Sequence, residues 1–274
     1  MKKTKKTSFT MIFVYIFLTI SAIFSISPFL WIIIGSTNDA HAIVTGKLTF
    51  GNQLATNFKN LFGSVNMGIA LGNSARIAFF TVLLTLTTTS MAAYGFQMYK
   101  TRHKENTYSF FLLTMMVPFA SLMIPLFQII VLLRMLNSLS AIILVTSASV
   151  FMIFFFRQSF MNYPTEILQA ARVDGANEFR IFVTIFIPSM KSTYAAAAIY
   201  SFMNSWNAYI WPLIVLQTND KRTATLLISS LSSAYNPDYG VIMTGIAVAT
   251  LPVIIVFFAF QKQFVQGMVG SVKQ

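Results

Sequence analysis

Residues Pro164 to Pro188 read PTEILQAARVDGANEFRIFVTIFIP, and this polar segment lies between two apolar runs that are each long enough to cross a membrane. Mixed charge and an Ala pair favour helix on both sides of Gly175, while glycine itself favours a sharp turn. The segment therefore predicts two short helices broken at Gly175. This shape is suited to docking against a partner in the cytoplasm.

The start of the first short helix can be predicted in more detail. Pro164 suits a turn before a helix, Thr165 suits the N-cap, and Glu166 suits the positive end of the helix dipole. Asp174 lies beside the turn at Gly175. We expect a second amphipathic stretch over Asn177 to Ile187, followed by Pro188 and the next membrane span.

The composition is that of an integral membrane protein. Of 274 residues, 56% are hydrophobic and only 9% are charged, which is too apolar for a soluble domain of this size. Cysteine is absent, which excludes disulfides, thiolate zinc sites and cysteine nucleophiles. His41 and His103 lie far apart in sequence, so no metal site is predicted.

Six apolar runs approach the ~20 residues that one helical span requires. Isolated polar residues interrupt some of them, and no alternating ten-residue pattern indicates a barrel. The predicted spans are 9–34, 68–97, 108–132, 139–156, 190–213 and 240–260, with a cytoplasmic loop over 157–189, and together they form a single transmembrane domain over residues 1–274. Pro118, Pro125 and Pro252 lie inside spans, where proline tends to kink a helix.

The basic residues set the predicted topology. The formal net charge is +12, but Lys and Arg flank apolar runs without interleaved aromatics, so nucleic-acid binding is not expected. With the N-terminus inside, thirteen basic residues fall on the cytoplasmic side and six outside. Both termini are therefore predicted in the cytoplasm. The run after MKKTKK continues to Ile34 without a cleavage pattern, so we interpret it as an uncleaved first span.

Two loops are predicted outside. The first, Ser36 to Met67, has a Gly-rich turn around Gly46 and Gly51 and a short helix near Asn57 to Phe62. It is either a solvated connector or a contact for an external partner. The second, Gln217 to Tyr239, carries the turn signal Asn236-Pro237-Asp238.

The 164–188 segment resembles the cytoplasmic coupling motif of the permease subunits of ATP-binding-cassette (ABC) importers, the inner membrane components of binding-protein-dependent transport. That motif runs Glu-Ala-Ala, then Gly, then an apolar-Pro ending. The matching residues are Gln169, Ala170, Ala171, Asp174, Gly175, Ala176, Phe182, Ile185, Ile187 and Pro188. Phe202, Trp206-Asn207 and Trp211-Pro212-Leu213 resemble the following span of the carbohydrate-importing, maltose-type branch, in its second permease.

The resemblance implies a type I importer permease: an all-α integral membrane protein of six transmembrane helices with a cytoplasmic coupling helix between spans four and five. It implies a bacterial inner membrane location and four kinds of partner: a cytoplasmic ATPase dimer, a second homologous permease, an extracytoplasmic solute-binding protein and a carbohydrate. The permease itself would hold no cofactor, since Mg-ATP belongs to the ATPase. The sequence agrees, because no G-x-x-x-x-G-K-[ST] phosphate loop occurs in it.

One position departs from the family pattern. Its leading Glu is Gln169 here, which replaces an ionic contact by a neutral hydrogen bond. Glu166 could supply charge, but it lies about 300° around an ideal helix from Gln169. The docking role of the loop is still expected.

Polar residues inside spans are candidates for a substrate path. Asn204, Trp206 and Asn207 in the fifth span could stack on and hydrogen-bond a sugar, and Gln128 in the third is a weaker candidate. The alternative is an interfacial aromatic belt with amide contacts between helices.

Two other classes of protein are alternatives for a chain of this composition. A secondary transporter driven by an ion gradient would place acids inside the membrane, whereas all seven acids lie outside the predicted spans. A membrane enzyme needs a nucleophile, a paired acid or a metal site, and no span supplies one.

Overall fold

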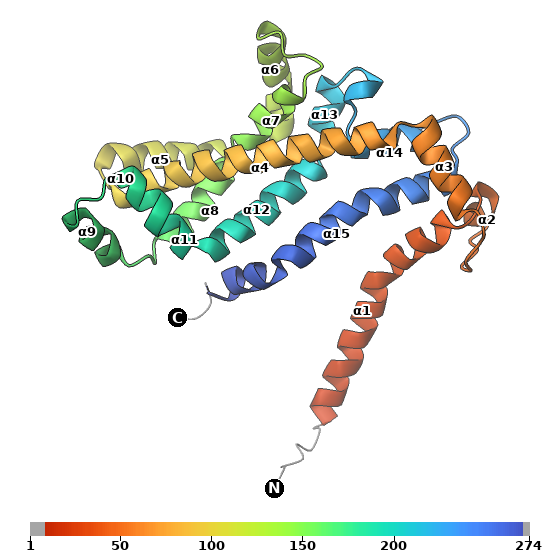
Figure 1. The fold of residues 1–274 in the computed structure, drawn as a ribbon, viewed down its shortest axis with the longest axis horizontal. Helices are drawn as coiled ribbons and strands as arrows, with labels where there is room; N and C mark the ends of the chain where they lie inside the picture. Colours follow the sequence, from red (N-terminus) through yellow and green to blue (C-terminus); the bar gives the residue numbers. More distant parts are fainter. Residues whose placement is uncertain (1–8, 271–274) are drawn as a thin grey trace. The chain divides into compact units, whose positions relative to one another are not determined.

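The computed structural model describes residues 9–270, and every regular element in that range is a helix. Within these residues, three helices are long and apolar enough to cross a membrane: α1 (Phe9–Ser36), α4 (Met67–Met98) and α15 (Tyr239–Gly270). They cover the first, second and sixth predicted spans. Figure 1 shows the helices in chain order. The all-α fold class is confirmed.

The other three predicted spans are each broken into two helices. The third becomes α5 (Arg102–Thr114) and α6 (Phe119–Leu132), bent by 102°, and the fourth becomes α7 (Leu139–Ser147) and α8 (Val150–Phe160), bent by 41°. The fifth predicted span is divided between α12 (Lys191–Trp206) and α13 (Ile210–Val215), with three residues between them. The third bent pair, at 84°, joins Glu178–Ser189 to α12, and the described residues form up to six spans if each of the three bent pairs counts as one.

The breaks have local causes. Pro118 disfavours helix at the residue before it and has no N–H to donate, so α5 ends four residues earlier and Pro118 becomes the N-cap of α6. The predicted kink at Pro118 is confirmed as a complete break. At the second break the Ser149 hydroxyl accepts the Met152 N–H at 3.3 Å and starts α8 afresh. Pro125 and Pro252 remain inside α6 and α15.

The chain divides into two compact units, of which the first holds residues 1–67 and 228–250. The loop after α1 contributes α2 (Ala40–Val44) and α3 (Leu54–Ser64), and α3 confirms the short helix predicted near Asn57 to Phe62. The buried Asn57 side chain donates to the carbonyls of Ser36 and Asn38 at 2.9 and 3.0 Å. A Cβ on Gly240 would lie 2.7 Å from the Asn38 oxygen, so only glycine fits there. These contacts join the end of α1, α3 and the start of α15.

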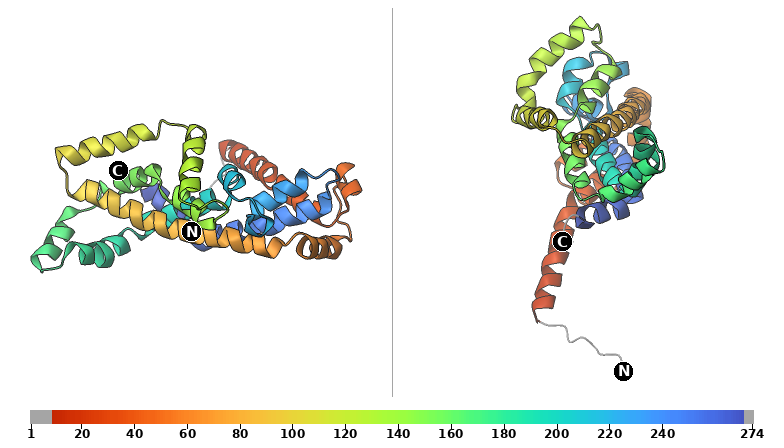
Figure 2. Two further views of the ribbon diagram at one scale, coloured as in Figure 1. Left: turned by 90° about the horizontal axis from the view of Figure 1, so that it is seen from above. Right: turned by 90° about the vertical axis from the view of Figure 1, so that its left-hand side faces the viewer.

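The second unit holds residues 68–227 and 251–274, and it contains the polar segment. Figure 1 shows α8 and α12 beside its long helix α4, and Figure 2 shows that α5 leaves the end of α4 at an angle. Ring contacts join α4 to α5, such as Phe96 to Tyr108 at 5.6 Å, and α8 to α12, such as Phe156 to Tyr194 at 4.9 Å. The remaining elements of this unit are α9 (Thr165–Val173), α10 (Glu178–Arg180), η1 (Ile181–Phe186), α11 (Ile187–Ser189) and η2 (Asn219–Lys221), and α14 (Ala224–Ser232) crosses the boundary between the units.

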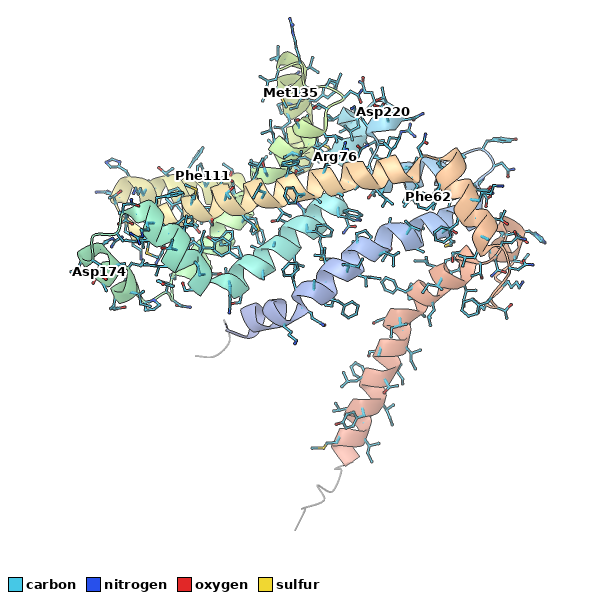
Figure 3. The ribbon with its side chains drawn as sticks, viewed as in Figure 1. Phe62, Arg76, Phe111, Met135, Asp174 and Asp220 are labelled. Carbon is cyan, nitrogen blue, oxygen red and sulfur yellow. The ribbon has the colours of Figure 1, made fainter. Side chains whose placement is uncertain are left out.

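At the other end of α4, hydrogen bonds fix the loop after α13. The Asn73 amide donates to the carbonyls of Asp220 and Arg222 at 2.8 and 3.0 Å, and the Ser74 hydroxyl accepts the Ala224 N–H at 2.9 Å. The Asn137 side chain accepts the Gln217 N–H at 3.0 Å. Asn73 and Asn137 thus serve as connectors between helices. Figure 3 shows this region around Arg76, Met135 and Asp220.

Candidate functional site

The polar segment folds as predicted into two short helical arms separated by a turn at Gly175. The first arm, α9, begins at Thr165, and its N-cap is Pro164, with φ −65° and ψ 108°. The prediction of Thr165 as N-cap is therefore wrong, because the extended conformation that proline fixes one residue earlier already ends the preceding loop. Glu166 lies in the first turn, where its charge favours the helix dipole.

The turn at Gly175 closes α9 with a Schellman motif. The Ala176 N–H donates to the Ala171 carbonyl at 3.1 Å, and the Gly175 N–H donates to the Arg172 carbonyl at 3.0 Å. This geometry requires a left-handed residue, and Gly175 has φ +80°. Asp174 is the C-cap, and the Asn177 side chain then accepts the Arg180 N–H at 2.8 Å and caps the second arm. The predicted break is confirmed.

An ion pair closes the turn across its open side. Arg172 donates from Nε to Glu178 Oε1 at 2.6 Å and from its terminal nitrogen to Oε2 at 3.4 Å. The Tyr94 hydroxyl on α4 donates to Glu178 Oε2 at 3.2 Å. Hydrogen bonding from Arg172 lowers the pKa of the Glu178 carboxyl. Sequence reasoning missed this pair, although opposite charges that flank a Gly turn were a visible signal.

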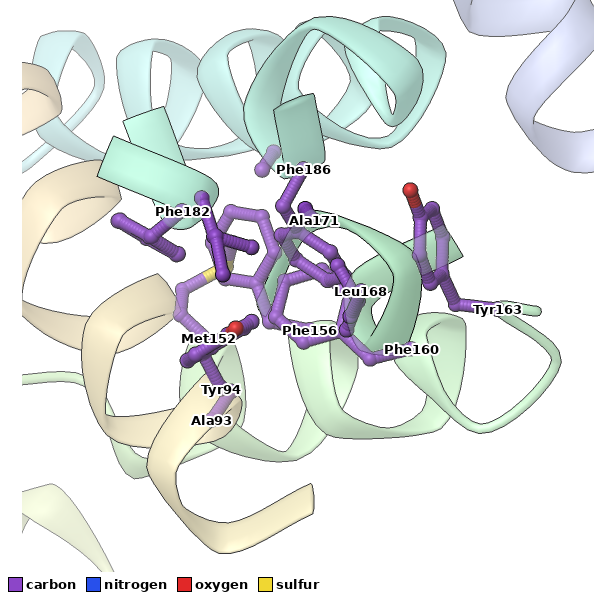
Figure 4. Close-up of a cluster of buried hydrophobic side chains, with 12 residues drawn as sticks. Ala93, Tyr94, Met152, Phe156, Phe160, Tyr163, Leu168, Ala171, Phe182 and Phe186 are labelled. Atoms are coloured by element: carbon purple, nitrogen blue, oxygen red, sulfur yellow. The ribbon is translucent and has the colours of Figure 1, made fainter. Parts of the chain in front are cut away.

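Beneath the two arms lies an aromatic cluster, defined as Tyr94, Phe156, Phe160, Tyr163, Phe182 and Phe186 (Figure 4). Phe186 is at its centre, with ring centroids 4.6 Å from Phe160, 4.7 Å from Tyr163 and 4.9 Å from Tyr94. Leu168 and Ala171, three residues apart on α9, pack against it from the first arm. Such edge-to-face pairs add about 0.5–1.5 kcal/mol each beyond burial. The cluster therefore fixes both arms to α4 and α8.

The second arm is one helical stretch from Glu178 to Ser189 with a π-helical turn at Ile181–Phe186. Pro188 has no N–H and cannot donate to the preceding turn, which favours a change in hydrogen-bond register just before it. The chain then bends by 84° into α12. Phe182, one of the predicted loop residues, is buried in the aromatic cluster, so it packs inward and holds the arm in place.

The outer surface of the two arms is apolar and exposed. We define the docking face as Ile167, Val173, Phe179 and Val183, with exposed fractions of 46%, 88%, 68% and 42%. Gln169, Ala170 and Glu166 are exposed beside it, whereas Ala171 is buried. Of the predicted loop residues, the structure thus separates an inward set, Ala171 and Phe182, from an outward set. No residue of the docking face was predicted.

The second predicted group lies elsewhere. Trp206 is buried, and its ring stacks on Phe202 at 5.4 Å and 24°, while the Thr225 hydroxyl donates to its carbonyl at 3.1 Å. Asn204 on α12 and Asn207, the C-cap that follows this helix, are exposed. Tyr200 and Met203 are exposed at helical spacing on the same face. Gln128 is exposed on α6. The exposed stripe of α12 is therefore amide and aromatic in character.

Comparison with known proteins assigns the family. Residues 86–270 match the family model described as "Binding-protein-dependent transport system inner membrane component". The chain is 51% identical to the lactose transport system permease protein LacG of Rhizobium radiobacter, over 94% of this chain and 95% of LacG. It is 41% identical to the arabinooligosaccharides transport system permease protein AraQ of Bacillus subtilis, over 73% of this chain and 72% of AraQ.

A solved structure shares the fold. A chain of a bacterial ABC transporter involved in the import of the acidic polysaccharide alginate superposes with a TM-score of 0.82 at 21% identity, covering 96% of this chain and 99% of that one. The match extends over the broken spans as well as the long helices. The fold, the two-armed segment and the family match agree: this chain belongs to the inner membrane components of binding-protein-dependent transport systems, the permeases of ABC importers.

Proposed function

We propose that this chain is one permease subunit of an ATP-driven importer of a sugar or oligosaccharide, and that its two-armed segment couples ATP hydrolysis on a separate ATPase to the membrane helices. Two relatives carry sugars in their names, a lactose permease and an arabinooligosaccharide permease. The exposed amides and aromatics of α12 suit hydroxyl-rich ligands. The docking face is the observation on which the coupling proposal rests.

The docking face has the properties of a protein contact. Four large apolar side chains are exposed on two short helices that also carry charged groups, whereas lipid-facing helices of this chain, such as α1, are apolar all round. An apolar groove on a cytoplasmic ATPase would accept Val173 and Phe179 as its most exposed anchors. Gln169 would contribute a neutral hydrogen bond at the edge. In this arrangement burial of the apolar side chains of the docking face replaces part of the ionic contact that a Glu at position 169 would make.

Coupling follows from how the arms are held. The aromatic cluster, the Arg172–Glu178 pair and Tyr94 bind both arms to α4 and α8, so the arms and these helices would move as one body. Closure of an ATPase dimer would displace the arms, and the displacement would pass to the spans. A membrane cavity shared with a second permease would then alternate between inward-facing and outward-facing states, with an external binding protein delivering the sugar. Mg-ATP would stay on the ATPase.

The test uses exposed residues, so that folding is spared. Val173→Asp with Phe179→Asp should abolish co-purification of the ATPase and uptake of labelled lactose or arabinooligosaccharide in proteoliposomes, because each Asp would have to be desolvated in the groove. Leu48→Asp is the matched control, since Leu48 is 69% exposed on the first outer loop. Normal co-purification of the double variant would refute docking through this face. Uptake that persists without ATP but with an ion gradient would support the secondary transporter instead.

A further inference from the structure

The turn between α4 and α5 carries a strongly basic surface that the coupling mechanism does not use. We define the basic turn as Lys100, Arg102, His103 and Lys104, which follow the last residue of the membrane-length helix α4, Met98. Lys100, Arg102 and His103 are exposed and Lys104 is half-buried. Because α4 is long enough to cross the bilayer, the turn lies at a membrane surface whichever side that surface faces.

The acids nearest to this turn are already paired. Glu105 accepts from Arg157 at 2.6 Å, and Glu178 is held by Arg172. Within residues 9–270, no salt bridge involves Lys100, Arg102 or Lys104. The Lys104 ammonium instead lies 4.9 Å from the centre of the Tyr99 ring. Three cations within five residues therefore form no ion pair among residues 9–270, and Lys100 contributes only a longer-range attraction to Glu105.

The helix that follows has one side turned to the protein and one turned away. Tyr108 is buried against Phe96 and Arg157. Phe110 and Leu113, three residues apart, are 63% and 62% exposed. A phospholipid with its headgroup at the basic turn would find an apolar track for its acyl chains along these two side chains. A soluble anion has no acyl chains that could lie along these two side chains.

We infer that the basic turn binds the phosphate headgroup of an anionic phospholipid, whose acyl chains lie along Phe110 and Leu113. Basic residues next to a span are attracted to anionic lipid, and each strengthens the attraction about fivefold. The site adjoins the two-armed segment, because the Tyr99 ring contacts both Lys104 and the Arg172 guanidinium, whose central carbon lies 5.8 Å from the ring centre. The bound lipid would therefore lie beside the two-armed segment of the proposed function without taking part in its contact with the ATPase.

The test measures lipid binding directly, by native mass spectrometry of the detergent-purified chain titrated with phosphatidylglycerol or phosphatidylethanolamine. The unmodified chain should prefer phosphatidylglycerol, and Lys100→Gln/Arg102→Gln/Lys104→Gln should lose that preference by on the order of a hundredfold. A charge-preserving variant, Lys100→Arg/Lys104→Arg, should retain it. Lys47→Gln/Lys59→Gln/Arg76→Gln, which removes the same charge from exposed positions elsewhere, should retain it too.

Two results would overturn the proposal. Equal phosphatidylglycerol preference in the unmodified chain and the triple Gln variant would show that the basic turn is not the site. Displacement of the lipid by millimolar inorganic phosphate would show a free-anion site instead. ATPase co-purification is measured in parallel and should be unchanged in the triple Gln variant, so a failure of lipid binding is distinguishable from a failure of coupling.

Discussion

The Glu178 carboxylate accepts two hydrogen bonds at once, from Arg172 across the turn and from Tyr94 on α4. Both need the carboxylate as an acceptor. Its side chain is 43% exposed, so solvent screens the ion pair and its contribution to stability stays at or below about 1 kcal/mol. The pair therefore matters more for where the second arm lies than for whether the protein folds.

The sign of its pH dependence follows from the lowered pKa of Glu178. A carboxyl whose folded pKa is depressed contributes stability above its unfolded pKa and loses that contribution as pH falls through the folded pKa. The unmodified chain should thus melt slightly above Glu178→Gln at about pH 7. The difference should begin to shrink near the ordinary glutamate pKa of about 4.3 and vanish only below the lowered pKa of Glu178. Thermal unfolding in detergent across this range measures it.

The control is Glu166→Gln, on the same segment, because no salt bridge of Glu166 is found in residues 9–270. Glu166→Gln removes only the interaction of a first-turn charge with the helix dipole, so it should lower the melting temperature less than Glu178→Gln at about pH 7. A difference between Glu178→Gln and the unmodified chain that persisted at acid pH would contradict the role of the charged carboxylate. It would point instead to packing of the longer Glu side chain.

At the level of elements, α5 and α8 are joined by a second ion pair of different character. The Arg157 side chain is only 10% exposed, donates to Glu105 at 2.6 Å and lies 3.9 Å over the Tyr108 ring. A planar guanidinium can do both, whereas an ammonium is a compact, strongly hydrated charge. Since α8 leads directly to the two-armed segment, the Arg157–Glu105 contact fixes the position of the helix that precedes this segment.

Arg157→Lys should therefore lower the free energy of unfolding by about 1–2 kcal/mol although charge is kept. Arg180→Lys, at an exposed arginine outside any salt bridge of the described chain, should have no effect. Tyr108→Phe is informative because the Tyr108 hydroxyl is buried without a hydrogen-bond partner in the described residues. It keeps the ring, so its melting temperature should equal or exceed that of the unmodified chain. A loss with Tyr108→Phe would reveal a partner of that hydroxyl.

How far the sequence predicted these elements depended on residue type. Gly175 and Pro118 act through their own backbone preferences, so each residue alone predicted its feature: Gly175 the turn and Pro118 the helix break. The 41° break at Ala148-Ser149 has neither residue and depends on a serine cap. The Glu178–Tyr94 contact joins residues 84 apart, and nothing in the local pattern points to it. Family resemblance placed Phe182 in the coupling segment, but only packing shows that it faces inward.

At the scale of the whole molecule, the two halves of each bent pair decide the topology. If α5 and α6 together form one span, the turn after α6 lies on the opposite side from the basic turn; if they form a re-entrant loop, both lie on the same side. The positive-inside count favours the first arrangement, with both termini in the cytoplasm. The absence of cysteine makes the question accessible, because each introduced thiol is the only one in the chain.

Single cysteines at exposed positions should then separate into two groups when intact cells are treated with a membrane-impermeant maleimide. Asn52→Cys, Leu132→Cys and Ser233→Cys should react from outside, whereas Lys100→Cys and Asn162→Cys should react only after permeabilisation. Reaction of Leu132→Cys only after permeabilisation would show that α5 and α6 re-enter, which leaves an odd number of spans and moves the two-armed segment outside. Because ATP is cytoplasmic, that segment could then no longer be the coupling element, and labelling of Asn162→Cys in intact cells would lead to the same conclusion.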